Sequence, residues 1–382
     1  MTTTLEIIFA AGCALLAYAY FVFPLILILL AAASRPDTAD KSAAGGADSA
    51  AWPSISVLVA AYNEEGVIAE KVRNFLASDY PGPSEIIIVS DGSTDRTADV
   101  VRELAGDRVR MVELPARSGK GVAINTAVPM ARGDLLAFTD ANTFFAADTL
   151  RELARPFADP RIGLVTGCTR YPDGSLGSAY QRYEQMLKQL ESKIGTIATA
   201  DGAIYAMRRR LWREHDPALI NDFLHPMMIG SEGFDAILAP GAVCFEEFDI
   251  GNEFRRQVRM VSQAARVYFA MMPVMLRRGA WRSAFVVTSH KFLRWLTALI
   301  LLLLLGTTIA LAPSGHFYQS ALASEVLFAL LALAGAVGLS AGGAATLAYR
   351  FVELTWAQTV GLWQFFRGQV PVVWQPRGSE GD

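Results

Sequence analysis

The chain has 382 residues, of which 52% are hydrophobic, and a net charge of −3 at pH 7. A slightly acidic chain without a polybasic tail gives no sign of nucleic-acid binding. Its three cysteines are too widely spaced for a zinc site or a disulfide framework, which favours a reducing compartment. The hydrophobic excess is concentrated in three blocks, which predicts a soluble domain between membrane segments.

The first apolar block is Leu5–Ala33, which carries no charge after Glu6. It is long enough to cross a hydrocarbon core about 30 Å thick. A signal peptide would have a basic start and a shorter apolar run, so we expect residues 1–33 to be a retained transmembrane helix. Residues 34–52 are rich in Ala, Gly, Ser and Asp and are expected to form a flexible linker.

Residues 53–272 alternate short β-branched runs with helical patterns. Strands are expected at Ile55–Ala61, Glu85–Ser90, Val109–Leu114 and Asp134–Thr139. This alternation predicts an α/β fold with a mainly parallel, Rossmann-like sheet, in which ligands bind beyond the carboxyl ends of the strands. Tyr62–Glu64, Asp91–Asp95 and Asp140–Asn142 follow three of those ends, so we expect the site there.

The expected site has no glycine-rich phosphate loop. No G-x-G-x-x-G follows the first strand, and Gly119-Lys120-Gly121 lacks the flanking residues of a P-loop. Acidic side chains at strand ends indicate instead a divalent metal ion that bridges a diphosphate. Lys120 would add a compact positive charge to that site.

Two further transmembrane helices are expected at residues 292–312 and 326–349. The loop between them, residues 313–325, contains no Lys or Arg. Basic residues flank the other ends of the three spans, at Arg35, Lys41, Lys291, Arg294 and Arg350. The positive-inside rule therefore predicts a multi-pass protein of the inner membrane, with residues 34–291 and the C-terminus in the cytosol and the N-terminus outside.

Two amphipathic segments adjoin these spans, residues 273–291 and the first part of residues 350–382. Both mix aromatic and aliphatic side chains with few charges, which is typical of helices that lie in the membrane interface. Helices that pack on the soluble domain show the same pattern, and both interpretations stay open.

The strand-end residues resemble those of glycosyltransferase family 2, whose catalytic domain has the GT-A fold. The resemblance runs from about Ser56 to Met260. Ala60–Glu65 looks like the family's first nucleotide motif, and Val89–Thr97 is similar to the second, in which the first Asp holds the base, usually uracil. The resemblance therefore implies a UDP-sugar bound by Ala61, Tyr62, Glu64, Asp91, Lys120 and Asp140.

Thr139-Asp140-Ala141-Asn142 occupies the family's D-x-D position. The resemblance implies that Asp140 and Asn142 are ligands of Mg²⁺ or Mn²⁺. An amide oxygen brings no charge, so Asp140 carries more of the electrostatic load. Weak or water-mediated metal binding is therefore expected.

Thr199–Ala203 looks like the family's acceptor-side motif, which implies acceptor contacts from Asp201 and Gly202. Asp201 could equally form a turn before Gly202. Asn221–Phe223 stands where the family has two acids, and the second, Asp222, is the implied catalytic base. Inverting transfer needs one carboxylate that removes the acceptor hydroxyl's proton. Because Asn221 is uncharged, the pKa of Asp222 is expected to lie below that of a base in a two-acid pair.

Arg256-Gln257-Val258-Arg259-Met260 stands where the family's processive synthases carry Q-x-x-R-W. The resemblance implies that Arg256 or Arg259 stabilises the diphosphate leaving group, although a pair at this spacing can also be a solvated helix face. The missing Gln and Trp and the small number of spans argue against processivity.

The sequence thus predicts an inverting glycosyltransferase whose acceptor is a hydroxyl of a lipid-linked or membrane-proximal saccharide. Its partners would be a nucleotide-sugar donor, that acceptor and membrane lipids. Three alternatives stay open: a processive polysaccharide synthase, a transferase that acts on polyprenyl phosphate, and a non-catalytic sensor of sugar nucleotides. The sequence predicts neither the sugar nor the oligomeric state.

Overall fold

The computed structural model describes residues 2–34, 52–170, 179–246, 253–339 and 343–370. Most of the expected linker and the last twelve residues of the chain lie outside these ranges. By its internal contacts the chain forms two compact units. The larger comprises residues 29–248 and 266–286, and the smaller comprises residues 1–28, 249–265 and 287–370, within the described parts of each.

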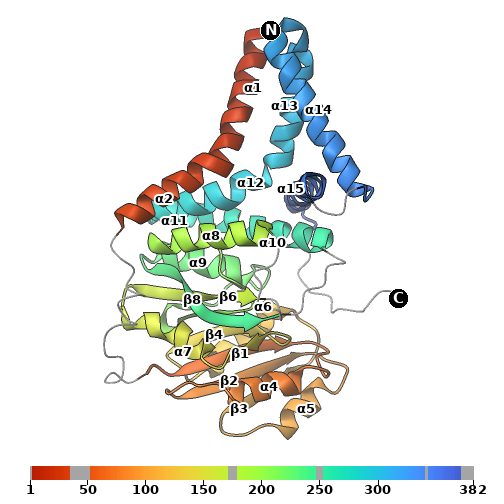
Figure 1. The fold of residues 1–382 in the computed structure, drawn as a ribbon. Helices are drawn as coiled ribbons and strands as arrows, with labels where there is room; N and C mark the ends of the chain where they lie inside the picture. Colours follow the sequence, from red (N-terminus) through yellow and green to blue (C-terminus); the bar gives the residue numbers. More distant parts are fainter. Residues whose placement is uncertain (1, 35–51, 171–178, 247–252, 340–342, 371–382) are drawn as a thin grey trace. The chain divides into compact units, whose positions relative to one another are not determined.

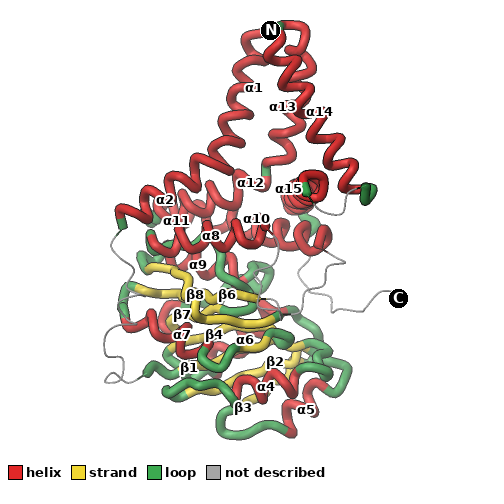
Figure 2. Tube along the Cα trace, in the orientation of Figure 1, coloured by secondary structure: helices red, strands yellow, loops and turns green. Residues whose placement is uncertain are grey.

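The larger unit is built on one eight-stranded sheet, in the order β3-β2-β1-β4-β7-β6-β8-β5 (Figures 1 and 2). Its strands are β1 (Ile55–Ala61), β2 (Ser84–Asp91), β3 (Val109–Leu114), β4 (Leu135–Asp140), β5 (Phe144–Phe145), β6 (Ile162–Arg170), β7 (Tyr205–Arg208) and β8 (Asp235–Phe245). Its helices are α4 (Ile68–Leu76), α5 (Thr97–Glu103), α6 (Lys120–Ala127), α7 (Thr149–Ala154), α8 (Ala179–Lys193) and α9 (Asn221–Ser231). Short 3₁₀ turns follow α6, α7 and β7, at Val128–Met130, Arg155–Ala158 and Arg209–Leu211.

The expected parallel sheet is confirmed for β1 to β4, which pair in parallel with one another. β7 lies between β4 and β6 and runs antiparallel to both, whereas β6 and β8 are parallel. The mixed sheet follows from the chain's return through β7, which the sequence pattern did not predict. Asp91 and Asp140 are the last residues of β2 and β4, so the carboxyl ends of parallel strands place both at one edge of the sheet.

Both faces of the central strands are buried, which explains why β1 and β2 are nearly continuous apolar runs. In β1, Val57 and Val59 belong to one hydrophobic cluster and Leu58 to the other. β2 divides in the same way, with Ile86 and Ile88 on one face and Ile87 on the other. This alternation fixes the register, because a slip by one residue would exchange the two faces.

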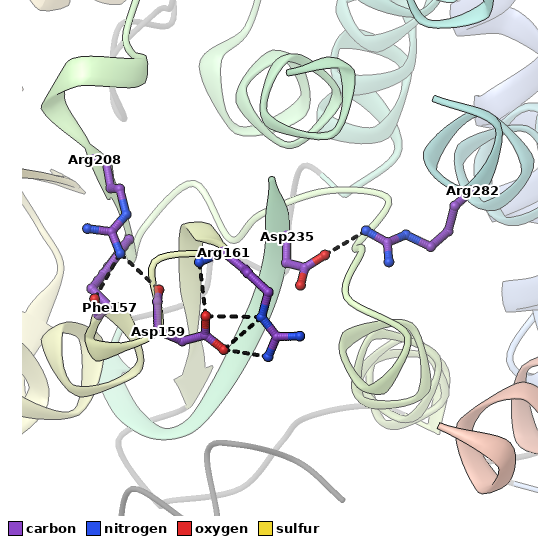
Figure 3. A network of polar contacts seen from close by, with 6 residues as sticks. All are labelled: Phe157, Asp159, Arg161, Arg208, Asp235 and Arg282. Carbon is purple, nitrogen blue, oxygen red and sulfur yellow. Dashed lines mark hydrogen bonds and ion pairs between the residues drawn. The ribbon is translucent and has the colours of Figure 1, made fainter. Parts of the chain in front are cut away.

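The helix α11 (Trp281–Val287) begins against the larger unit. Arg282 donates to Asp235 at 2.6 Å, as Figure 3 shows, and to the carbonyl oxygen of Gly195 at 3.1 Å. The Ser283 hydroxyl lies 3.1 Å from that of Thr196, while Trp281 is 65% exposed. These contacts support packing on the soluble domain for the start of α11, and the exposed Trp281 leaves an interfacial role open.

The smaller unit contains most of the apolar helices. Its helical elements are α1 (Thr2–Ala17), a π-helical turn (Tyr18–Val22), a second such turn (Thr288–Phe292), α12 (Leu293–Trp295), α13 (Thr297–Leu311), α14 (His316–Ala336) and α15 (Ala344–Phe366). Three helices, α2 (Phe23–Ala33), α10 (Glu253–Arg277) and α11, have residues in both units. In the described chain three helices are long and apolar enough to cross a membrane: Thr2–Ala33, Thr297–Ser314 and His316–Ala336.

The third of these helices lies earlier in the chain than the expected span of residues 326–349. α14 already begins at His316, and within it Glu325 is hydrogen-bonded to the Thr308 hydroxyl of α13 at 3.1 Å. The helix ends before Gly338, whose φ of +72° is a common C-terminal stop. The expected span crosses this stop, because average hydropathy does not register a backbone conformation.

Candidate active site

The first two strand-end motifs are hydrogen-bonded to each other in the larger unit. Asn63 adopts a φ of +54°, which Asn tolerates better than most residues. Its amide oxygen accepts a hydrogen bond from the backbone N–H of Thr94 at 2.8 Å, and the N–H of Glu64 donates to the Thr97 hydroxyl at 2.8 Å. The segment after β1 and the segment after β2 therefore form one rigid edge of the site. Ala61, at the end of β1, is buried within it.

Asp91 is buried at the end of β2, and its carboxylate holds the loop that precedes α6. Its two oxygens accept hydrogen bonds from the backbone N–H groups of Ser118 at 2.7 Å and Gly119 at 2.8 Å. A carboxylate has further lone pairs, so the implied contact with a nucleobase remains compatible with these bonds. That contact stays a prediction, whereas the anchoring of the loop is a role that the sequence did not indicate.

The loop that Asp91 anchors leads into α6, whose first residue, Lys120, lies next to Asp140. Lys120 Nζ lies 2.5 Å from Asp140 Oδ1, and both side chains are partly exposed. Burial acts to lower the pKa of Lys120, but the charges of Asp140, Asp222 and Glu246 outweigh it and raise the pKa. Lys120 is therefore positively charged at neutral pH. It interacts electrostatically both with Asp140 on the donor side and with Asp222, the expected catalytic base.

Arg117, in the same loop, was not singled out from the sequence. Its guanidinium carbon lies 4.0 Å from the centroid of the Tyr62 ring, which is cation–π geometry. Its buried Nη2 has no hydrogen-bond partner within the described chain. The only feature of the sequence that could have pointed to Arg117 as a site residue is its position in the loop before Lys120. Stacking over Tyr62 puts a positive charge beside the expected nucleotide-binding segment.

Asp222 lies in the first turn of α9, which begins at Asn221. Its backbone carbonyl oxygen accepts the N–H of Ala200 at 2.9 Å, so α9 is fastened to the acceptor-side segment. Gly202 lies against the Asp222 carboxylate, and a Cβ atom at residue 202 would be 3.0 Å from Oδ2. The structure thus brings together Asp222 and Gly202, whose roles as base and acceptor contact stay predictions.

The pKa of Asp222 is raised above the usual value for an aspartate. Burial is the main cause, opposed by Lys120 and reinforced by the carboxylates of Asp140 and Asp201. The neighbouring Asn221 carries no charge, but the carboxylates of Asp140 and Asp201 still repel the ionised form of Asp222. The Asn221 side chain is instead hydrogen-bonded to His215 Nε2 at 2.9 Å.

Asp201 was expected either to contact the acceptor or to form a turn before Gly202, and the structure shows the turn. Its carboxylate accepts hydrogen bonds from the Thr169 hydroxyl at 2.8 Å and from the N–H of Ala203 at 3.2 Å. An acceptor contact from Asp201 stays a prediction. Arg256 and Arg259 lie on α10 in the smaller unit, and their action on a diphosphate also stays a prediction.

The residues present could hold a metal ion only if phosphate groups of a bound donor also coordinate the ion. No cluster of three or more His, Cys, Asp or Glu side chains suitable for a metal exists among the described residues. Asp140 and Asn142 would supply two oxygen atoms, and within the described ranges nothing hydrogen-bonds to the Asn142 amide. Mg²⁺ is commonly held by one or two carboxylates together with substrate phosphates, and this pair fits that pattern.

Known proteins resemble the chain in sequence. Residues 56–215 match the model of glycosyl transferase family 2. The chain is 36% identical over 118 residues to a beta-monoglucosyldiacylglycerol synthase of Nostoc sp., covering 30% of this chain and 25% of that protein. It is 30% identical over 163 residues to a poly-beta-1,6-N-acetyl-D-glucosamine synthase of Staphylococcus epidermidis, covering 41% and 39%. The chain thus spans well under half the length of these relatives.

A solved structure resembles the chain over most of its length. It is the mannosyltransferase PcManGT from Pyrobaculum calidifontis, in complex with GDP-Man and Mn²⁺. The TM-score is 0.69 at 23% identity, over 95% of this chain and 99% of that one. This likeness establishes the GT-A fold. The chain therefore carries a domain of glycosyl transferase family 2 over residues 56–215.

Proposed function

We propose that the chain is an inverting glycosyltransferase that moves a sugar from a nucleotide-diphosphate sugar, with UDP as the expected nucleotide, to a hydroxyl of a lipid-linked or membrane-proximal saccharide. One observation carries the proposal. Lys120 is held by Asp140 on the donor side, and its pKa is also raised by Asp222. The expected donor group and the expected base therefore share one electrostatic site, as a direct displacement requires.

On the donor side, Asp140 and Asn142 would hold Mg²⁺ or Mn²⁺, which neutralises charge on the diphosphate when bound. Lys120 contributes a fixed positive charge next to Asp140. Arg117 and Tyr62 flank the expected nucleotide segment, and Asp91 fixes the loop that carries Arg117 and Lys120. These residues orient the donor and stabilise the nucleotide diphosphate as it leaves.

On the acceptor side, Asp222 accepts the proton of the attacking hydroxyl. The hydroxyl oxygen forms the bond to the anomeric carbon while the bond from that carbon to the diphosphate oxygen breaks. A raised pKa suits this role, because a base is most effective when its pKa lies near the working pH. The bond from Ala200 and the contact with Gly202 hold Asp222 in place.

A lipid-linked acceptor is supported by the three apolar helices and by the similarity to a diacylglycerol-sugar synthase. We propose that the larger unit faces the cytosol at the inner membrane, where membrane lipids would contact the apolar helices. Similarity to a poly-N-acetylglucosamine synthase keeps processive synthesis as a second candidate. The length distribution of products from purified protein distinguishes the two.

Asp222→Asn tests the proposal. Purified protein is supplied with UDP- and GDP-sugars, Mn²⁺ and lipid-linked saccharides, and release of nucleoside diphosphate is measured. The variant is expected to bind UDP like the wild type in calorimetry, while transfer falls about 10³-fold or more. Near-normal transfer by the variant would remove Asp222 from the role of base. Transfer to polyprenyl phosphate that does not depend on Asp222 would favour that alternative, and binding without any transfer would favour a sensor.

A further inference from the structure

Lys71 is a buried charged side chain that the proposed reaction does not use. It lies on α4 and is 1% exposed. Its Nζ donates to the Thr139 hydroxyl at 2.9 Å and to the carbonyl oxygen of Thr143 at 2.5 Å, and lies 4.4 Å from the centroid of the Phe145 ring. An ammonium has three donors, so two hydrogen bonds and one ring face account for all of them.

The two hydrogen-bond partners of Lys71 flank the residues expected to bind the metal. Thr139 directly precedes Asp140, and Thr143 directly follows Asn142. A single ammonium therefore fixes both ends of the Asp140–Asn142 segment. At its start Asp140 is also paired with β1 and bound by Lys120. After β4 the segment's own internal bond, from the N–H of Thr143 to the carbonyl oxygen of Asp140, is long at 3.4 Å, so Lys71 is the main support at the Thr143 end.

The same face of α4 extends this support by one turn. Asn74 lies three residues after Lys71, so the two side chains are neighbours on the helix. The Asn74 amide donates to the carbonyl oxygen of Phe145 at 2.9 Å and accepts the N–H of Phe145 at 2.8 Å. The helix α4 thus holds the chain from Thr139 to Phe145 at three points.

Stability alone does not explain a lysine at this position. No carboxylate forms an ion pair with Lys71 anywhere in the described residues. Burial lowers the pKa of Lys71 to about 7, and the nearby Cys244 and Asp140 offset this only in part. An apolar side chain of similar length would avoid the desolvation of a charge, and such replacements are often stabilising.

We propose that Lys71 is a positioning residue for donor binding: it holds the Asp140–Asn142 segment in the geometry that presents the Asp140 carboxylate and the Asn142 amide to a divalent metal and a diphosphate. The inference rests on the proposed function. Groups that orient metal ligands in this way typically change metal affinity about 10- to 100-fold when they are removed.

Binding of UDP to the full-length protein, measured by calorimetry with and without Mn²⁺, tests the proposal. Lys71→Met and Thr139→Val each remove the same hydrogen bond, from opposite sides. Each is expected to weaken Mn²⁺-dependent UDP binding about tenfold, whereas Thr139→Ser keeps the hydroxyl and stays within about twofold of the wild type. The double variant is expected to bind no more weakly than Lys71→Met, because both changes break one shared contact.

Arg208→Met is the matched control. Arg208 is also a cation held by backbone carbonyls, those of Phe157 and Asp159 (Figure 3) and that of Ile162. It lies 5.3 Å from the centroid of the Phe157 ring. It pairs with Leu135 at the opposite end of β4 from Asp140, about 17 Å away along the strand. This variant is expected to melt at a lower temperature and to bind UDP normally.

Three results would overturn the proposal. The first is unchanged Mn²⁺-dependent UDP binding by Lys71→Met, and the second is an equal loss in Arg208→Met, which would make Lys71 a stabilising residue only. If Lys71→Met does not fold, the pair Thr139→Val and Thr139→Ser decides, and equal affinities in that pair are the third. Failure of the wild type to bind UDP or GDP with Mn²⁺ would instead refute the proposed function itself.

Discussion

Gly202 sets how closely the acceptor-side segment approaches the expected base. A methyl group at this position would lie 3.0 Å from Asp222 Oδ2, which is tighter than normal packing. Gly202→Ala should therefore displace the carboxylate while leaving the donor side untouched. Because small displacements of reacting groups are costly, kcat is expected to fall about 10- to 100-fold with little change in the KM for the donor.

Gly66→Ala is the control for that substitution, because a Cβ atom at residue 66 meets nothing within 4 Å. Steady-state kinetics with varied donor separate the two constants. A rise in the donor KM without a fall in kcat would show that Gly202 acts on binding rather than on the base.

The raised pKa of Asp222 has consequences for both activity and stability. Burial, Asp140 and Asp201 disfavour its charged form in the fold more than Lys120 favours it. The group therefore binds its proton more tightly in the folded than in the unfolded chain, and its contribution to stability falls as pH rises through that window. Above the folded pKa, the ionised carboxylate destabilises the fold.

Asp222→Asn is thus expected to abolish transfer and yet to melt at the same or a higher temperature than the wild type at pH 7. Wild-type kcat should fall on acidification at a pH above the usual range of an aspartate. Thermal melting and a pH–rate profile measure both effects. A marked loss of stability in the variant would show that the surroundings of Asp222 stabilise the ionised carboxylate, which would mean a lowered rather than a raised pKa.

At the level of elements, the loop between β3 and α6 depends on Gly92. This glycine has a φ of +65°, and a Cβ atom there would lie 2.4 Å from the backbone nitrogen of Arg117. Gly92→Ala should move the loop that carries Arg117 and Lys120 and should destabilise the fold by about 1–3 kcal/mol. UDP affinity and the melting temperature should both fall.

Gly106→Ala serves as the comparison for Gly92, because a Cβ atom at residue 106 meets no neighbour within 4 Å. It should behave like the wild type in both measurements. Normal UDP affinity in Gly92→Ala would mean that the loop does not contribute to the donor site.

The sequence predicted β1 to β4 and missed β5 to β8, including the nine-residue β6 and the eleven-residue β8. β1 and β3 have the expected bounds. The β-branched run of β1 is buried on both faces and is distinctive, whereas β3 was recognised although most of it is only partly buried. β5 has two residues and β7 has four, too few for a period to be read, so the antiparallel part of the sheet was not predicted. The third helix that is long and apolar enough to cross a membrane begins earlier than the expected span, and it ends earlier because Gly338 ends it through its backbone conformation.

Some residues of the candidate site could be recognised from the local sequence, and others only from the structure. Asp91, Lys120, Asp140 and Asp222 were predicted because they follow strands or match a motif, and their roles stay predictions. The structure brings Lys120 together with Asp140, and Gly202 with Asp222. Arg117 and Lys71 were missed, because their significance lies in contacts between residues distant in sequence. No local pattern distinguishes a buried lysine on α4 from a solvated one.

At the scale of the whole molecule, charge asymmetry predicts the orientation in the membrane. The described helices that can cross a membrane are Thr2–Ala33, Thr297–Ser314 and His316–Ala336. No Lys or Arg lies between residues 312 and 336, whereas Lys291, Arg294 and Arg350 lie near the other ends of these helices. The positive-inside rule therefore still predicts an outside turn around Ser314, even though the third helix begins earlier than expected.

Labelling of intact cells with a membrane-impermeant maleimide tests this orientation. In a background with Cys13 replaced by Ala, Ser314→Cys and Thr2→Cys are expected to react from outside. Asp107→Cys, on the surface of the larger unit, is expected to react only after the membrane is opened. Cys168 and Cys244 are buried and should stay silent. Labelling of Asp107→Cys in intact cells would place the larger unit outside, away from the cytosolic nucleotide sugars that the proposed reaction needs.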